Sequence, residues 1–296
     1  MKKIIYCSSF YEKGRIYIDD FFKCLLNVNN NFFDKITLNI VIDDLLDAKY
    51  ALEKFKKKVN INLTYVSKKH TITEIRNILI KNAFILDGDI LIFIDMDDLL
   101  LENNLIAHRE ALEDADISFG DMSIVDKNGD FLNKNLFDKI SLPNLIKDYK
   151  PLLSGNFMGL SNTAVRKKVL EKNFVEIPSH LVATDWWLYT TLLLKGCIAK
   201  KTRYKVASYR QHADNVLGYR NDSKLDTFLK TCKIAKEHFL SLPNLLDFKN
   251  AVTKITIVEE FALKNPSEVI KLLNKKKNFQ NVWFSQIFST YKDIDK

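Results

Sequence analysis

In the first half of the chain, short apolar runs alternate with segments whose apolar residues recur at helical spacing. The runs are typical of buried strands, and the segments between them are typical of core-facing helices. Strand and helix therefore alternate four times, which predicts a parallel, doubly wound sheet of the α/β class. The predicted strands cover 3–10, 36–42, 61–66 and 90–94, and the predicted helices cover 18–26, 48–57 and 71–84.

The second half has weaker periodicity, and the chain beyond Arg220 is helical in pattern throughout. We expect an α/β domain over 1–218, followed by a helical C-terminal extension over 219–296. The predicted elements are a helix at 103–113, a strand at 116–119, a hairpin turn at Asn128-Gly129, helices at 164–172 and 185–195, a strand at 205–208, and helices at 223–239, 244–263 and after Asn265-Pro266.

Three carboxylates, Asp95, Asp97 and Asp98, directly follow the fourth apolar run. In open α/β sheets, ligands bind beyond the carboxyl ends of the strands, where Asp43-Asp44 also ends the second run. So much negative charge is unfavourable unless a cation balances it, and hard oxygen ligands suit Mg²⁺ or Mn²⁺. The alternative is a strand end that carries solvated acids only.

Composition excludes several classes of protein. A hydrophobic content of 47% with 28% charged residues is that of a globular protein, and no apolar run is long enough to span a bilayer. The four cysteines form no Cys-x-x-Cys pair, which argues against zinc ribbons and disulfide frameworks. With eight glycines and neither a Gly-x-Gly-x-x-Gly nor a Walker motif, a bound nucleotide would need a metal to hold its phosphates. We expect a cytoplasmic protein.

The net charge of +8 is concentrated in the C-terminal extension. Residues 219–296 contain 14 Lys and Arg against 9 Asp and Glu, which is +5 and leaves +3 for the rest. The end of this extension combines Lys275-Lys276-Lys277 with apolar residues at helical spacing from Phe279 to Tyr291. We favour a helix packed on the catalytic domain or on another subunit. The alternative is peripheral contact with the inner face of a membrane.

Short motifs occur along the first 218 residues in a recognisable order. They are Asp43-Asp44, Arg76-Asn77, Asp95-Met96-Asp97-Asp98, Phe119-Gly120-Asp121, Val125-Asp126, Asn128-Gly129, Ser154-Gly155-Asn156, Thr184-Asp185-Trp186, and Tyr209-Arg210-Gln211-His212 with Asn215. In order and spacing this series resembles the family 2 glycosyltransferases, inverting enzymes of the GT-A fold that use nucleotide-sugar donors. The first strand departs from the family's usual Pro-x-Tyr-Asn. The resemblance therefore does not determine which nucleotide base is bound.

The resemblance implies a role for each matching position. Asp185 would be the general base that deprotonates an acceptor hydroxyl. A divalent metal would be the cofactor, and the acceptor would be a glycan or a lipid-linked glycan of the lipopolysaccharide or capsule type. The implied nucleotide-sugar-binding residues are Ser8, Asp43, Asp44, Arg76, Asp95 and Met96, the metal ligands are Asp97 and His212, and the further site residues are Asp98, Arg210, Trp186 and Asn156.

Parts of the sequence also match two other functions. The run from Phe93 to Leu100 also resembles the first motif of haloacid-dehalogenase-type phosphohydrolases, with Asp95 as nucleophile and Asp97 as acid/base. That motif normally lies near the start of its domain, whereas here three strand–helix units precede it. A basic nucleic-acid-binding protein would explain the pI of about 9.0. It would leave the acid-rich first half unexplained.

Overall fold

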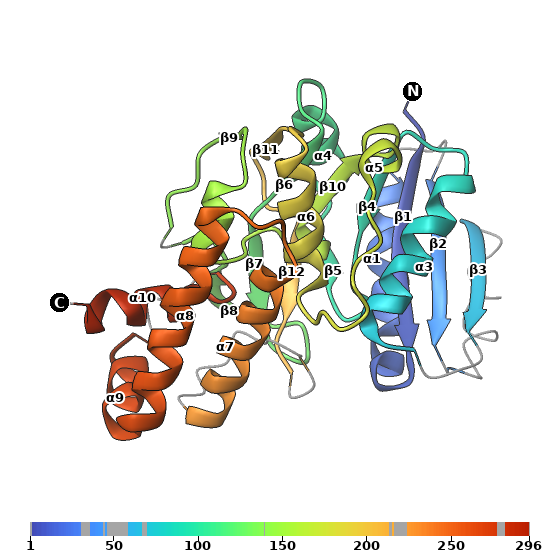
Figure 1. The fold of residues 1–296 in the computed structure, drawn as a ribbon. Helices are drawn as coiled ribbons and strands as arrows, with labels where there is room; N and C mark the ends of the chain where they lie inside the picture. The colour runs from blue at the N-terminus through green and yellow to red at the C-terminus, as the bar shows by residue number, and fades with distance from the viewer. Residues whose placement is uncertain are drawn as a thin grey trace.

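Four parallel strands form the first half of the main sheet in the computed structural model (Figure 1). They are β1 Ile4–Tyr11, β2 Ile36–Asp43, β3 Asn60–Val66 and β4 Ile90–Phe93. All four confirm the strands expected from the apolar runs. The structure describes residues 2–30, 36–43, 45, 59–66, 70–138, 140–212, 215, 224–276 and 282–295, so the predicted helix at 48–57 and the side chain of Asp44 lie outside the described residues.

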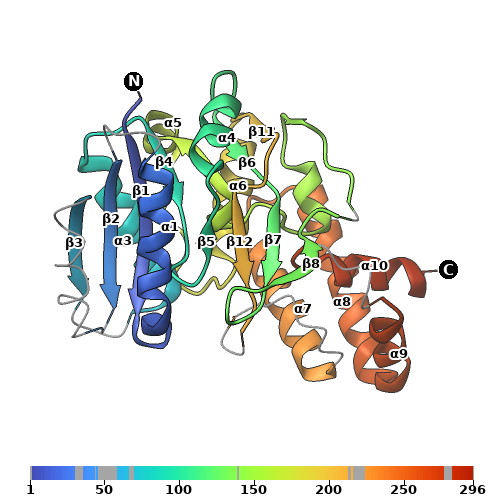
Figure 2. The same cartoon turned by 180° about the vertical axis from the view of Figure 1, so that it is seen from behind.

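The order of these strands in the sheet is β3-β2-β1-β4. The chain therefore reverses its direction of winding between β1 and β4, and this switch point is where doubly wound sheets bind ligands. Helices α1 Ile18–Asn30 and α3 Ile72–Ile85 cover opposite faces of the sheet (Figures 1 and 2). The predicted capping box is present: the Thr71 side chain accepts from the Glu74 amide, and the Glu74 carboxylate accepts from the Thr71 amide.

The second half of the sheet is mixed. Strand β10 Thr163–Arg166 runs antiparallel between β4 and β6 Ile117–Phe119, and β11 Ala199–Lys201 and β9 Leu145–Ile146 complete the eight strands. The predicted helix at 164–172 is wrong in its first turn, because residues 164–166 belong to β10 and helix α5 covers Lys167–Asn173. Pairing with two neighbouring strands satisfies more backbone groups than one more helical turn would.

A second sheet of four strands lies beside the main one, in the order β5-β12-β7-β8. Its strands are β5 Leu99–Leu100, β12 Ala207–Arg210, β7 Met122–Val125 and β8 Phe131–Asn135. Strands β7 and β8 form the predicted hairpin, and Gly129 takes the positive φ of 94° that its turn requires. Strand β12 carries Tyr209 and Arg210 past β5, which directly follows the acidic segment.

Five further helices lie before residue 218 among the described residues. They are the α-helices α4 Asn104–Ala111 and α6 Thr184–Leu194, and the 3₁₀ helices η1 Glu12–Tyr17, η2 Lys150–Ser154 and η3 Leu160–Asn162. Helix α6 is buried on nearly all sides, because its Trp, Leu and Tyr side chains pack in the larger of the two cores. Its first turn is thereby fixed relative to the sheet.

The C-terminal extension consists of α7 Leu225–Leu240, α8 Leu246–Lys264, α9 Pro266–Lys276 and α10 Ser285–Ile294. Among the described residues, α7, α8 and α9 confirm the helices predicted at 223–239, at 244–263 and after Asn265-Pro266. The helical spacing from Phe279 to Tyr291 is confirmed only from Ser285 onward, because residues 282–284 form no helix. Apolar side chains of α7, α8 and α10 belong to the same buried cluster as those of α3 and α6. Ile287 and Phe288, which are part of the predicted basic and aromatic helix, are buried in that cluster. The extension therefore packs on the α/β part of the chain.

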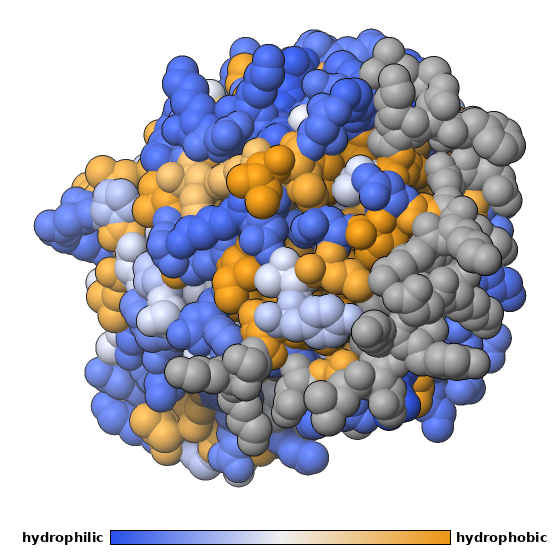
Figure 3. All heavy atoms as spheres, turned by 90° about the vertical axis from the view of Figure 1, so that its right-hand side faces the viewer, coloured by the Kyte–Doolittle hydropathy of each residue, from blue (hydrophilic) through white to orange (hydrophobic). Residues whose placement is uncertain are grey.

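The surface at the β3 edge carries hydrophobic as well as charged side chains (Figure 3). Tyr65 on β3 is 54% exposed, and Ile72 and Ile85 at the two ends of α3 are also exposed. Among the described residues, none of the helices combines the length and the apolar composition that crossing a membrane requires.

Candidate active site

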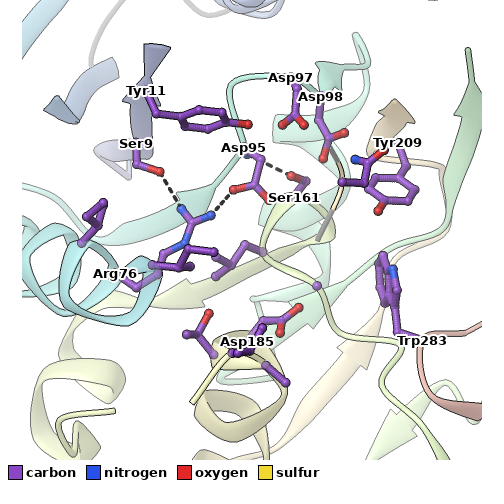
Figure 4. Close-up of a pocket in the computed structure, with 18 of the residues that line it drawn as sticks. Ser9, Tyr11, Arg76, Asp95, Asp97, Asp98, Ser161, Asp185, Tyr209 and Trp283 are labelled. Carbon is purple, nitrogen blue, oxygen red and sulfur yellow. Dashed lines mark hydrogen bonds and ion pairs between the residues drawn. The ribbon is translucent and has the colours of Figure 1, made fainter. Parts of the chain in front are cut away.

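A pocket of about 480 Å³ opens at the carboxyl ends of β1, β2 and β4. Ser9 and Tyr11 line it from β1, Asp43 from the end of β2, and Asp95 from the segment after β4. Figure 4 shows Asp95, Asp97, Asp98, Asp185 and Arg76 around the same space, together with the aromatic rings of Tyr11, Tyr209 and Trp283. The pocket therefore lies at the switch point, as the acid pattern of the sequence predicts.

Arg76 reaches into the pocket from the second turn of α3. Its guanidinium forms an ion pair with Asp95 and donates to the Ser9 hydroxyl at 3.2 Å. The Arg76 side chain is 12% exposed and that of Asp95 is 34% exposed, so the pair faces the pocket. Burial lowers the pKa of Arg76 and the Asp95 charge raises it, with a net increase. The Ser161 hydroxyl accepts from the Asp95 amide at 2.9 Å and fixes the backbone there.

Asp97 and His212 meet at the other side of the acidic segment. Nε2 of His212 lies 2.7 Å from Oδ2 of Asp97, and both side chains are about nine-tenths buried. The two residues are 115 positions apart, and β12 brings them together. Asp97 lines the pocket. A carboxylate and an imidazole side by side are suitable ligands for a divalent transition metal.

Asp98 and Arg210 hold the acidic segment 95–98 in place through hydrogen bonds. The Arg210 amide donates to Oδ1 of Asp98 at 2.9 Å, and its Nε donates to the Asp97 carbonyl at 2.7 Å. The guanidinium also bonds the Lys127 carbonyl at 2.8 Å and the Asp20 carboxylate at 2.9 Å. Burial, and then the charges of Asp97 and Asp95, raise the pKa of Asp98 well above its ordinary value.

Asp185 stands across the pocket from the Arg76 pair, in the first turn of α6 (Figure 4). Its carboxylate accepts from the Trp186 amide at 2.8 Å and from the Asn156 side-chain amide at 3.1 Å. Burial raises the pKa of Asp185 from 3.8 to about 6, against the effect of the Trp186 amide, while the charge of Asp95 raises it further. A carboxylate with this pKa is ionised at neutral pH yet basic enough to accept a proton.

Several predicted residues lie behind the pocket rather than in its lining. Ser8 is fully buried in β1, and the pocket is lined by its neighbour Ser9 instead. Met96 is buried, and its sulfur packs so closely on Gly14 that no Cβ would fit there. Trp186 is buried in the core, and Arg210 is 1% exposed. These side chains support the residues that line the pocket.

The structure also places residues in the pocket that were not among the predicted site residues. Tyr11 lines it beside the acids, Ser161 holds Asp95, and Tyr209 faces it from β12. Trp283 and Phe284 enter it from the C-terminal extension. The only sequence signal for Trp283 was the apolar spacing of the tail, which predicted packing and gave no position for the side chain.

The residues present fit a divalent cation in part. Asp97 and His212 supply two ligand atoms, and no group of three His, Cys, Asp or Glu side chains in ligand geometry occurs among the described residues. Metals that act on phosphates commonly take one or two protein carboxylates and fill their remaining positions with substrate oxygens and water. The pair therefore suits a metal that binds together with a diphosphate.

The fold is similar to that of solved glycosyltransferases. *S. aureus* TarS 1-349 in complex with UDP-GlcNAc matches with a TM-score of 0.62 and 14% identity, over 98% of this chain and 92% of that one. The mannosyltransferase PcManGT from *Pyrobaculum calidifontis*, in complex with GDP-Man and Mn2+, matches with a TM-score of 0.58 and 12% identity, over 99% and 80%. These similarities establish the fold, which is the GT-A fold.

Sequence comparison alone does not place the chain in a family. No protein-family model matches it. The trigger factor of *Buchnera aphidicola* subsp. *Acyrthosiphon pisum* is 22% identical over 258 residues, which cover 84% of this chain and 53% of that protein. The chain thus spans about half the length of the curated relatives it matches. This identity is too low to show a family, and the assignment of function depends on the site.

Proposed function

We propose that this chain is a glycosyltransferase that moves a sugar from a nucleotide-sugar donor to an acceptor hydroxyl with inversion at the anomeric carbon. The observation that carries the proposal is one pocket with two chemically different sides. One side is lined by Arg76, Asp95 and Asp97, with His212 bonded to Asp97 outside the lining, and the other side is lined by Asp185, with a pKa of about 6. Transfer by inversion needs a leaving-group side and a base on the opposite side.

The donor half is built at the switch point of the sheet. Asp43 ends β2 and Ser9 lies on β1, where a nucleoside would lie against the strand ends. Arg76 orients Asp95 toward the pocket, so that its second oxygen is available to a ribose hydroxyl. The structural neighbours bind UDP-GlcNAc and GDP-Man, which is consistent with a nucleotide sugar here and leaves the base open.

Asp97 and His212 would hold a divalent cation, either Mn²⁺ or Mg²⁺, and the cation would neutralise charge that develops on the departing diphosphate. Arg210 fixes the backbone carbonyl of Asp97 and the carboxylate of Asp98, so the ligand pair is held before the metal arrives. The Mn2+ in the mannosyltransferase structure supports divalent metal use.

Asp185 acts as the general base. It takes the proton of the acceptor hydroxyl as that oxygen forms a bond to the anomeric carbon, while the bond from that carbon to the diphosphate oxygen breaks. The Asn156 amide holds one carboxylate oxygen and the Trp186 amide holds the other, which fixes the plane of the carboxylate. A positioned base contributes about 10² to 10⁴ in rate.

The acceptor would be a hydroxyl of a surface glycan, free or linked to lipid, by analogy with the family that the motifs resemble. Peripheral contact with a membrane remains a prediction from the sequence. Ile287 and Phe288, which would provide that contact, are buried against the rest of the chain.

A thermal-shift panel of UDP, GDP, CDP and dTDP tests the proposal, each with Mn²⁺ and with EDTA. A ligand at a hundred times its dissociation constant adds about 2.7 kcal/mol to the free energy of unfolding. We expect one diphosphate to raise the melting temperature only with Mn²⁺, and Asp97→Ala and His212→Ala to abolish that increase. The matched control is Asp126→Ala, which changes an acid in the β7–β8 turn.

The phosphohydrolase alternative gives a different result in the same samples. It predicts no nucleotide shift and hydrolysis of p-nitrophenyl phosphate that Asp95→Asn abolishes. The position of the acidic segment argues against it, because three strand–helix units precede a motif that normally lies near the start of a phosphohydrolase domain. Absence of a shift with every nucleotide would overturn the proposed glycosyl transfer.

A further inference from the structure

The C-terminal segment 282–294 enters the candidate active site. Trp283 and Phe284 line the pocket. Trp283 lies with Tyr209 on the side opposite Ser9 and Arg76 (Figure 4). The indole of Trp283 and the ring of Tyr209 meet edge to face, with centroids 5.5 Å apart. Two partly exposed aromatic rings from segments far apart in the sequence thus form one wall of the pocket.

The segment is held at this place by its backbone. The Asn156 amide donates to the Trp283 carbonyl at 2.8 Å, and the two residues form an isolated antiparallel bridge. The side chain of the same Asn156 donates to Asp185. One residue therefore ties the position of the C-terminal segment to the candidate base.

An aromatic stack anchors the segment next to Trp283. The ring of Phe284 stacks on Trp186 at 4.6 Å, and Trp186 stacks on His238 of α7 at 4.0 Å. Phe284 has a φ of 69°, which a bulky residue adopts only when its surroundings enforce it. This backbone turn sends the Phe284 ring into the core and leaves the Trp283 ring facing the pocket.

Two glycines leave room for the Trp283 residue. A Cβ on Gly159 would lie 3.0 and 3.1 Å from ring atoms of Trp283, and a Cβ on Gly155 would lie 3.0 Å from its carbonyl. The φ of Gly159 is −80°, so only the indole, and no backbone strain, opposes a larger side chain there. The loop at 154–159 and the indole are therefore complementary in shape.

We infer that Trp283, with Tyr209, forms the platform on which the ring of a carbohydrate acceptor stacks beside Asp185. The inference rests on the proposed function. An acceptor hydroxyl must come within about 2.6–3.2 Å of the base, so the ring that bears it must lie against the wall next to Asp185. Aromatic faces offer an apolar surface with a polar edge, which suits the C–H face of a pyranose. The C-terminal extension thereby supplies part of the acceptor site.

The test separates acceptor binding from donor binding. With the nucleotide sugar that the wild type accepts, kinetics are measured against p-nitrophenyl glycosides as surrogate acceptors, and the Kd of the matching nucleoside diphosphate is measured with Mn²⁺. We expect Trp283→Ala to raise the acceptor KM about tenfold or more, while the diphosphate Kd stays within about twofold. Trp283→Phe should restore part of the loss.

Two further variants distinguish an effect of the Trp283 ring on acceptor binding from a general loss of folding. Gly159→Ala keeps the indole and displaces it, so it should also raise the acceptor KM. Tyr291→Ala removes another aromatic side chain of the same segment, outside the pocket lining, and should leave the acceptor KM unchanged. Melting temperatures of all variants identify any loss of folding.

The outcomes are distinct. An unchanged acceptor KM in both Trp283→Ala and Gly159→Ala overturns the platform. Equal losses of diphosphate and acceptor affinity also overturn it, because they show that the ring supports the whole pocket. If the wild type binds no nucleotide and transfers no sugar, the proposed function itself fails, and the platform fails with it.

Discussion

The partly buried carboxylate of Asp185 should lower the stability of the protein and should be required for turnover, and Asp185→Asn should separate the two effects. Burial raises the pKa of Asp185 from 3.8 to about 6. A group whose pKa is raised on folding stabilises the folded state fully only below its unfolded pKa. That stabilisation is lost as the pH rises through the folded pKa. Above about pH 7 the ionised carboxylate is therefore a cost to the folded state.

The difference between 3.8 and about 6, at about 1.36 kcal/mol per pH unit, corresponds to about 3 kcal/mol at neutral pH. Water in the pocket screens part of this cost. Asparagine keeps an acceptor for the Trp186 amide but loses the bond from Asn156, which costs about 1 kcal/mol. The variant should thus be about 1 to 2 kcal/mol more stable, which raises the melting temperature by about 2 to 3 °C.

Urea unfolding of both proteins between about pH 4 and pH 8 measures this difference. The stability gain of Asp185→Asn should be full above about pH 7 and should disappear below about pH 4, where the wild-type carboxyl is protonated in both states. Turnover of the variant should fall by about 10² to 10⁴, and wild-type kcat/KM should fall as the pH drops through about 6.

Asp126→Asn is the control of opposite sign. Backbone amides, that of Asp130 first, lower the pKa of Asp126, so its ionised form stabilises the fold above its unfolded pKa and this stabilisation is lost as the pH falls. Asp126→Asn should therefore be less stable than the wild type at neutral pH. The reasoning is refuted if Asp185→Asn shows no gain at pH 8, if its gain is independent of pH, or if the variant keeps wild-type turnover.

Three other predictions concern Arg210, Asn156 and the two buried cysteines Cys7 and Cys232. Arg210→Lys should lower the free energy of unfolding by about 2 to 4 kcal/mol in urea titrations, because an ammonium cannot bond Asp97, Lys127 and Asp20 together. Asn156→Ala should move the acid limb of the pH–rate profile to higher pH, since it removes a donor to the ionised Asp185. Burial raises the pKa of Cys7 and Cys232 to about 12, so both thiols should resist a thiol reagent at pH 8 until urea unfolds the protein.

The parallel half of the fold could be predicted because short stretches of sequence determine each of its strands and helices. Four apolar runs and the capping box at Thr71 each specify their own element, and the carboxyl ends of parallel strands meet at one edge whatever follows. The acids at 95–98 could therefore be placed in a pocket before the structure was known. Strand β10 was missed because Thr163–Arg166 runs directly into residues with helical spacing, and only pairing with β4 and β6 makes it a strand.

The two sides of the pocket that we propose for donor and acceptor differ in how far the sequence determines them. Arg76, Asp95 and Asp97 belong to short motifs whose order and spacing along the chain can be recognised in the sequence. Trp283 has no such signal: neither Gly nor Asn marks the turn at Phe284, although its φ of 69° is one that these residues favour. Tertiary packing of Phe284 on Trp186 imposes that turn.

The same packing makes the C-terminal extension part of the site rather than an appendage. Trp186 is fully buried, and its neighbour Asp185 owes its raised pKa first to burial. Phe284 and His238 cover the two faces of Trp186, and both belong to the extension. Residues beyond 218 therefore help to keep water away from the candidate base. The raised pKa of Asp185 and the wall formed by Trp283 both depend on the packing of the extension, so the proposed proton transfer and the proposed acceptor binding share one structural support.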